Sequence, residues 1–171
     1  MKDYLNVRLF GGMYIEGLGG QLTIETLRSP MLAKLLVYLL CHHKDQCSVQ
    51  EMVDALWPDE SSDNPAGALK NLVYRLRKIL STIWPEYDLV ITGKGYYSWN
   101  PEISLVMDTE VFEDLKQQSL SEKDPDKLIG ICTQMTEQYK GRMFAGFDDT
   151  YWIASLGTYY FSAYEDSVIK L

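Results

Sequence analysis

The clearest pattern of apolar and polar positions in the chain runs from residue 64 to residue 80. At 3.6 residues per turn, apolar residues that recur at steps of three and four fall on one stripe of a helix. The pattern therefore predicts an amphipathic helix over residues 64–80 whose apolar stripe faces a core. The stripe consists of Leu69, Leu72, Val73, Leu76 and Leu80. The opposite face carries Lys70, Asn71, Tyr74, Arg75 and Lys78, with Arg77 at its border.

The chain before this helix predicts a short antiparallel sheet and two more helices. Apolar and polar residues alternate in the three short segments 5–10, 14–16 and 21–25, which Gly-Gly pairs separate. Ser29 and Pro30 begin a leucine-rich, buried helix. Ser48 and Glu51 form a capping box for a second helix, which ends before Pro58. Asn64 and Pro65 then start the amphipathic helix in the same way as Ser29 and Pro30 start the first.

The segment that follows predicts a hairpin. Residues 88–99 form two runs rich in β-branched and aromatic residues, and Gly93, Lys94 and Gly95 lie between them. A sheet, three helices and a hairpin in this order are typical of a winged helix-turn-helix. In that motif the third helix enters the major groove, and the hairpin, or wing, reaches the neighbouring backbone or minor groove.

The last third of the chain is helical by pattern. Asp108 can cap one helix, Asp124 and Pro125 open a second that Gly141 ends, and a third runs from about residue 149 to the end. The third helix carries more apolar side chains than its neighbours can cover, and large exposed apolar patches are usually interfaces. We therefore expect self-association through residues 110–171, with an interaction surface at Trp152, Leu156 and Tyr160.

The amphipathic helix differs in charge from the rest of the chain. The formal net charge of the chain is −8, yet residues 64–81 hold four basic residues and no acidic one. Because non-specific DNA affinity comes mostly from Lys and Arg on phosphates, an acidic chain can bind DNA only through such a local patch. A solvated Lys/Arg face on an ordinary helix remains the alternative.

Composition limits the other classes of function. The 171 residues can build one domain or two small ones. The longest apolar run, residues 35–41, is too short to span a membrane, and the start lacks a signal-peptide layout. Three cysteines without a CxxC pair predict no disulfide framework and favour the reducing cytoplasm.

The sequence predicts no enzyme, cofactor or metal centre. Cys41, His42, His43 and Cys47 could be drawn as a metal site, but adjacent histidines point to different sides of a helix. Phosphate-binding glycine loops, GxSxG and HExxH are absent. The acidic pairs at 59–60 and 148–149 lie in loop-like segments, where solvated charge is the simpler interpretation.

Five segments in order carry a resemblance to a known family: LLVYLL, ALWP, ALKNLVYRLRKIL, TGKGYY and VMDTEVFEDL. Together they resemble the OmpR/PhoB-type DNA-binding domain of the SARP family (Streptomyces antibiotic regulatory proteins) and the bacterial transcriptional activation domain (BTAD) that follows it. The resemblance implies an α+β fold, with a winged helix-turn-helix and N-terminal antiparallel sheet over residues 1–106. An all-α, tetratricopeptide-like region would begin over residues 107–171 and run through Phe144, so the chain would be a fragment or a shortened member.

The same resemblance implies a function and its residues. It implies a sequence-specific transcriptional regulator, most simply an activator, that binds double-stranded DNA as a homodimer and contacts RNA polymerase. Arg75, Leu76, Arg77 and Lys78 resemble the family's DNA-contacting signature, and Lys94 occupies the wing tip. Ala66 and Gly67 stand where an arginine is common, and the wing, residues 91–97, has one lysine. We therefore expect weak backbone contacts, with affinity that depends on dimerisation.

Side-chain chemistry assigns roles within the recognition helix, residues 64–80. Asn71 can pair with adenine and Arg75 with guanine. The expected backbone contacts are Lys70, Arg77, Lys78 and Lys94. Arg77, at the border, could equally pair with Asp54 or Glu51. The alternative function is a protein-interaction module on the same scaffold with weak or no DNA binding, and exposure of the basic face distinguishes the two.

Overall fold

The computed structural model describes residues 3–59, 63–143 and 151–171. Its contacts divide the chain into two compact units. The first unit consists of Met1–Leu5 and Glu16–Ser104, and the second of Asn6–Ile15 and Leu105–Leu171. Neither unit is one continuous stretch of the chain, whereas the sequence places a single boundary between residues 106 and 107.

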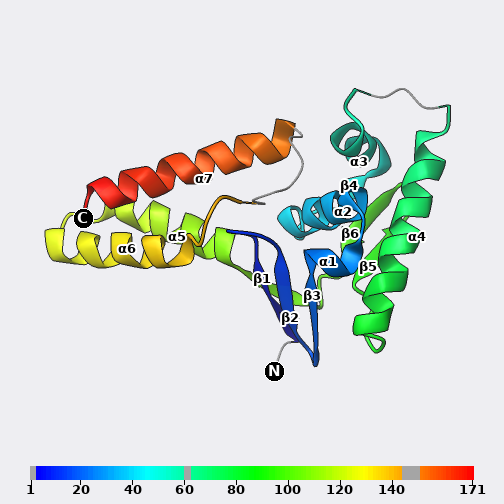
Figure 1. Ribbon diagram of the computed structural model, residues 1–171, viewed down its shortest axis with the longest axis horizontal. Helices are drawn as coiled ribbons and strands as arrows, with labels where there is room; N and C mark the ends of the chain where they lie inside the picture. The colour runs from blue at the N-terminus through cyan, green and yellow to red at the C-terminus, as the bar shows by residue number, and fades with distance from the viewer. Residues whose placement is uncertain (1–2, 60–62, 144–150) are drawn as a thin grey trace. The chain divides into compact units, whose positions relative to one another are not determined.

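A four-stranded sheet has the strand order β3-β2-β1-β7 (Figure 1). Its strands are β1 (Tyr4–Arg8), β2 (Tyr14–Gly17), β3 (Gly20–Thr23) and β7 (Ser104–Met107). The three N-terminal strands confirm the predicted sheet. The predicted strand over 21–25 is wrong in its last two residues, because a short helix, α1 (Ile24–Leu27), begins at residue 24. β7 was not predicted.

In the first unit, the described residues also form three longer helices and a second, three-stranded sheet. The helices are α2 (Pro30–Cys41), α3 (Val49–Leu56) and α4 (Pro65–Ile83). The strands are β4 (Cys47–Ser48), β5 (Val90–Gly93) and β6 (Tyr96–Trp99), in the order β4-β6-β5. α2, α3 and α4 pack against one another, with the leucines of α2 and the apolar stripe of α4 in the core. This is the winged helix that the sequence predicts.

The helix starts confirm the capping signals in the sequence. The hydroxyl of Ser29 accepts a hydrogen bond from the Leu32 amide, and Ser48 forms the full capping box with Glu51. The Asn64 side chain accepts from the Gly67 amide at 3.1 Å. Each bond satisfies an amide that has no partner within its helix, which fixes where the helix begins.

The described residues of the second unit form three helices, α5 (Asp108–Ser121), α6 (Pro125–Gln138) and α7 (Tyr151–Ile169). α6 packs against both α5 and α7. Inside the unit, the ring of Phe10 lies 5.5 Å from that of Phe112 and 5.3 Å from that of Tyr160. Asp124 caps α6 as predicted, since its carboxylate accepts from the Asp126 amide at 2.9 Å.

The predicted capping role of Asp108 is wrong. The N-cap of α5 is Met107, whose side chain makes no capping hydrogen bond. The carboxylate of Asp108 instead accepts hydrogen bonds from the backbone amides of Leu9, at 2.9 Å, and Phe10, at 3.1 Å. Both residues are buried, so their amides need a partner inside the protein, and the carboxylate supplies it.

Some predicted features lie outside the described residues: Glu60, Phe144, the acidic pair at 148–149 and the first residues of the last helix. Among the residues that are described, no helix is both long enough and apolar enough to cross a membrane.

Candidate nucleic-acid interface

The two faces of α4 are separated as the sequence predicts. All five residues of the apolar stripe are buried. Lys70, Asn71, Tyr74, Arg75 and Lys78 are exposed, and 65% of the Tyr74 side chain is accessible to solvent. Within the described part of the chain, the side-chain nitrogens of Lys70, Arg75 and Lys78 make no hydrogen bond or ion pair. Three cations on one helix are therefore available to an anionic partner.

The wing is a tight hairpin formed by β5 and β6. Gly93 pairs with Tyr96, so only Lys94 and Gly95 form the turn, and Lys94 is exposed. Gly95 has φ +79°, a conformation that glycine adopts without strain. The carbonyl of Gly95 accepts a hydrogen bond from the Val49 amide at 3.2 Å, and β4 pairs with β6. The wing is thus held against the start of α3.

Arg77 does not lie with the other basic residues of α4. Its side chain is half-buried, and its Nε and Nη2 donate to the carbonyl of Val90 at 3.1 and 2.8 Å. Nη2 also donates to the hydroxyl of Thr92. The sequence offered a phosphate or one of two acids, Asp54 or Glu51, as the partner of Arg77. In the structure the partner is β5.

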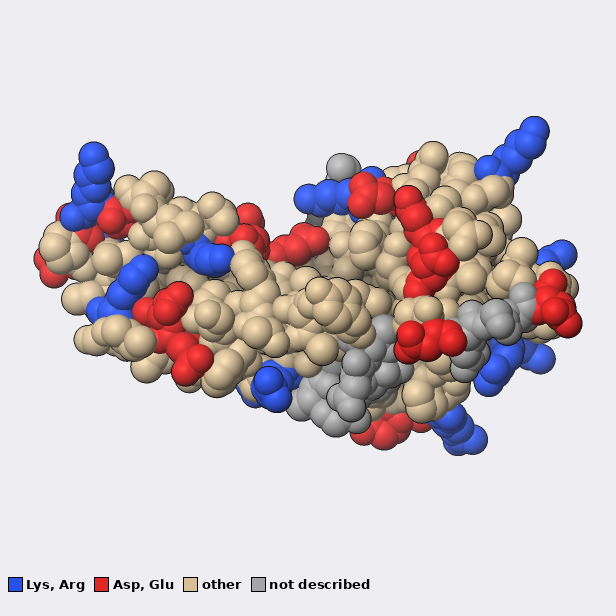
Figure 2. Space-filling view, turned by 90° about the horizontal axis from the view of Figure 1, so that it is seen from above, with Lys and Arg blue, Asp and Glu red and all other residues tan. Residues whose placement is uncertain are grey.

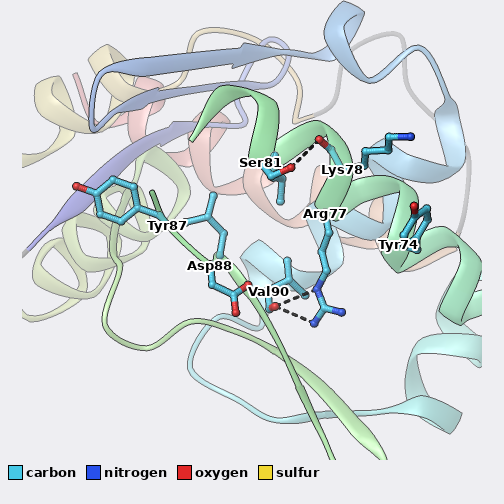
Figure 3. A pocket seen from close by; sticks show the side chains of 9 residues that line it. Tyr74, Arg77, Lys78, Ser81, Tyr87, Asp88 and Val90 are labelled. Atoms are coloured by element: carbon cyan, nitrogen blue, oxygen red, sulfur yellow. Dashed lines mark hydrogen bonds between the residues drawn. The ribbon is translucent and has the colours of Figure 1, made fainter. Parts of the chain in front are cut away.

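A pocket of about 410 Å³ lies beside the C-terminal half of α4. Figure 3 shows the Arg77 side chain reaching from α4 to the backbone of Val90 along this pocket. Its lining consists of Tyr74, Arg77, Lys78, Leu80, Ser81, Tyr87, Asp88, Leu89 and Val90. Tyr74, Arg77 and Lys78 are predicted DNA contacts, whereas Tyr87 and Asp88 come from the loop before β5 and were not singled out. Only the position of that loop beside α4, which is a tertiary contact, brings them to the site.

Negative charge gathers on another part of the same unit. Figure 2 shows Asp and Glu side chains grouped over the region of α3, where Glu51 and Asp54 are exposed. Asp54 accepts a hydrogen bond from Gln50 at 2.8 Å, and Glu51 is part of the capping box. The cations of α4 are therefore a local exception on an acidic surface, as the charge pattern of the sequence predicts.

The predicted interaction surface in the second unit is only partly exposed. Trp152, Leu156 and Tyr160 are each half-buried, and the Tyr160 ring lies 5.9 Å from that of Phe112. Other apolar side chains of the C-terminal segment are more accessible, above all Tyr151 and Ile169, both 82% exposed. The role of this surface stays a prediction.

The cysteine and histidine segment at residues 41–47 does not gather into a centre. Cys47 is buried in β4, and the ring of His42 stacks on that of Tyr38 with centroids 4.2 Å apart. Among the residues that the structure describes, no three His, Cys, Asp or Glu side chains lie where they could hold a metal ion together.

Comparison with known families identifies the first unit. Residues 25–97 match the family described as "Transcriptional regulatory protein, C terminal". The matched segment contains α2, α3, α4 and the Lys94 turn, so the family's domain and the winged helix of the structure coincide. The predicted OmpR/PhoB-type winged helix is confirmed.

A solved structure shows the same fold over a longer range. The structure of Mycobacterium tuberculosis EmbR in complex with a low-affinity phosphopeptide matches with a TM-score of 0.71 and 15% sequence identity. The match covers 97% of this chain and 43% of that chain, so the present chain spans less than half of EmbR. The likeness confirms the α+β fold with a helical region after the winged-helix domain. The comparison with curated proteins gave no match.

Proposed function

We propose that the chain is a sequence-specific DNA-binding transcriptional regulator of the SARP type. α4 would enter the major groove, and the wing, residues 91–97, would reach the flanking groove. The observation that carries the proposal is the exposed face of α4, which presents cations and an amide inside a domain of a transcriptional regulatory family. A helix of this kind fits the width of the major groove.

The exposed side chains divide into two kinds of contact. Arg75 and Asn71 can each make paired hydrogen bonds to a base edge, guanine for Arg75 and adenine for Asn71. Lys70, Lys78 and Lys94 act as point charges and are suited to phosphates. Tyr74 lies one turn from both Lys70 and Lys78 on the helix surface, and its ring can pack against the sugar-phosphate backbone or a base edge.

Two substitutions separate these roles. Arg75→Ala should reduce discrimination at one base pair by about 1–3 kcal/mol. Lys94→Ala should weaken binding to all duplexes alike and lower the slope of log K against log salt by about one unit. Lys127→Ala removes another exposed lysine, on α6, and is the matched control, with an unchanged slope expected. The assignment fails if Arg75→Ala and Lys94→Ala have the same effect on every duplex.

We further propose that the chain acts as a homodimer in the cytoplasm, activates transcription through RNA polymerase, and uses residues 107–171 as the start of a BTAD with tetratricopeptide-like helices. These points rest on the family resemblance and on the exposed apolar side chains at the end of α7, among them Val168 and Ile169. No catalysis is assigned to the chain. Light scattering tests the dimer: a strict monomer at high micromolar concentration, with and without DNA, would refute it.

One observation favours a second function. The surface over α3 is acidic and the net charge is −8, so a protein-interaction module with little DNA affinity is the alternative. Binding measurements at ~50 mM salt decide between them, because exposed charges are weakly screened there. If the wild-type chain binds no duplex under those conditions, the interaction module replaces the regulator.

A further inference from the structure

Arg77 links the recognition helix α4 to the wing strand β5. Among the hydrogen bonds of the described residues, it is the charged side chain of α4 that donates to the backbone of β5. The guanidinium leaves α4 and donates twice to the Val90 carbonyl and once to the Thr92 hydroxyl, both on β5. Figure 3 shows this side chain extended toward the strand and away from Lys78. These donors are already used before any DNA is present.

The partner atom explains why an arginine stands here. β5 is the edge strand of the order β4-β6-β5. Asn100 donates to the Leu89 carbonyl at 2.8 Å, so the next pair, Val90 with Trp99, is a non-hydrogen-bonded pair of the antiparallel ladder. The Val90 carbonyl therefore points to the open edge, where no strand can donate to it. The Arg77 guanidinium donates the hydrogen bonds that a neighbouring strand would otherwise supply.

The geometry of the donor also matters. A guanidinium is planar and carries several N–H groups in a fixed fork, so it can hold one carbonyl and a neighbouring hydroxyl together. An ammonium on a flexible chain keeps the charge but loses this fork. The contact thus depends on the shape of arginine and not only on its charge.

We propose that Arg77 is a positioning residue, which sets the distance between α4 and the wing so that the helix and Lys94 reach the duplex together. Lys94 follows β5 directly, and β5 is the strand that Arg77 holds. The inference rests on the proposed DNA binding. It replaces the expectation that Arg77 itself clamps a phosphate.

The test is a double-mutant cycle with R77K and K94A, measured as duplex affinity over a series of salt concentrations. If Arg77 positions the wing, R77K lowers the salt slope by about one unit although it keeps the charge, because the Lys94 contact is lost. The double variant then binds about as well as the weaker single variant, because both changes remove the same contact. If Arg77 contacts a phosphate directly, R77K keeps the slope, and its loss of affinity adds to that of K94A. That additive result overturns the proposal.

Controls keep the outcomes distinct. Thr92→Val removes one acceptor of the guanidinium without changing charge, and it should show the same coupling to K94A with a smaller loss of affinity. Thr133→Val makes the same change at an exposed position of α6 and should show no coupling to K94A. Circular dichroism checks that each variant is folded. If R77K does not fold, the Thr92→Val cycle decides, and additivity there overturns the proposal. A wild-type chain that binds no duplex refutes the proposed function and this inference together, whereas additive losses in a chain that binds refute only the inference.

Discussion

The carboxylate of Asp108 offers a sharp test of what holds the second unit together. It lies 99 residues from Leu9 in the chain, yet it accepts the amide hydrogen of Leu9 with both oxygens, at 2.9 and 3.1 Å. One of these oxygens also accepts from Phe10 at 3.1 Å. Asp108→Ala would leave both amides without a partner inside the protein.

The burial of the two amides sets the size of the effect. Leu9 is 0% and Phe10 4% exposed, so water cannot replace the lost acceptor without opening the unit. A buried donor without a partner costs about 1–3 kcal/mol, so Asp108→Ala should lower the free energy of unfolding by about 2–6 kcal/mol. Asp108→Asn keeps one acceptor oxygen and should cost about half as much. Either loss is a large part of the ~5–15 kcal/mol that stabilises a typical domain.

Urea unfolding followed by circular dichroism gives the free energy, and hydrogen exchange by mass spectrometry assigns the loss to a unit. Peptides from residues 6–15 and 105–143 should exchange faster in Asp108→Ala. Asp114→Ala removes an exposed carboxylate from the same helix and should change stability by less than about 0.5 kcal/mol. If Asp108→Ala is no more destabilising than Asp114→Ala, the account of this contact is wrong.

The same residue predicts a pH dependence. Burial raises the pKa of Asp108, while the amides of Leu9, Phe10 and Thr109 and the charge of Arg8 lower it by less. A carboxyl whose pKa is raised by folding adds stability below its unfolded pKa, and this contribution is lost as the pH rises through the folded pKa. The stability difference between wild type and Asp108→Asn should therefore grow as the pH falls from neutral through the carboxyl range. A difference that shrinks as the pH falls would mean that the hydrogen bonds lower the pKa of Asp108 by more than burial raises it.

Tyr139, Cys47 and Gly93 each allow a separate test of the packing. The Tyr139 hydroxyl is buried and has no hydrogen-bond partner among the described residues. Tyr139→Phe should therefore leave stability unchanged or raise it by up to about 1 kcal/mol in urea unfolding, and a larger loss would reveal a partner. Burial raises the pKa of the Cys47 thiol to about 11. Iodoacetamide at pH 8 should therefore spare Cys47 in the folded chain and alkylate it in denaturant, which peptide mass spectrometry can measure. Rapid labelling of Cys47 in the native protein would contradict this. A Cβ at Gly93 would lie 1.9 Å from the Tyr96 ring, so Gly93→Ala should displace that ring and speed amide exchange in β6, whereas unchanged exchange would show that the ring moves freely.

The parts of the fold that the sequence predicts depend on chemistry within a few residues. The side chains of Ser29, Ser48 and Asn64 each accept a hydrogen bond from the backbone amide three residues later in the same helix. The start of each helix can therefore be predicted from the neighbouring sequence. The turn at Lys94 and Gly95 is equally local. The two faces of α4 follow from helical periodicity alone, which is why the exposed residues of the candidate interface could be named in advance.

The parts that were missed depend on contacts between distant segments. β4 has only two residues, and it is a strand because Cys47 and Ser48 pair with Tyr97 and Tyr96. Lys34 is charged, yet it is buried within α2 because its ammonium donates to the carbonyl of Leu56 at the end of α3, at 3.0 Å. No local pattern distinguishes such a lysine from an exposed one.

Arg77 shows the same limit inside the candidate site. Periodicity places it at the border of the basic face, which is correct, but its partner is decided by an edge strand 13 residues away. A sequence cannot show that the Val90 carbonyl has no neighbouring strand to donate a hydrogen bond to it. The residue that looked like one more cation of the interface is therefore, in the structure, a link between α4 and β5.

Sequence-specific DNA binding by the exposed face of α4 can be tested by selection of bound duplexes from a random pool, with the wild-type chain and with Arg75→Ala in parallel. The wild type should enrich a defined sequence, and Arg75→Ala should retain binding but lose preference at one or more positions of it, because the side chain reads a base edge from the exposed face of α4. No enrichment by the wild-type chain, or the same enriched sequence from both proteins, would contradict it.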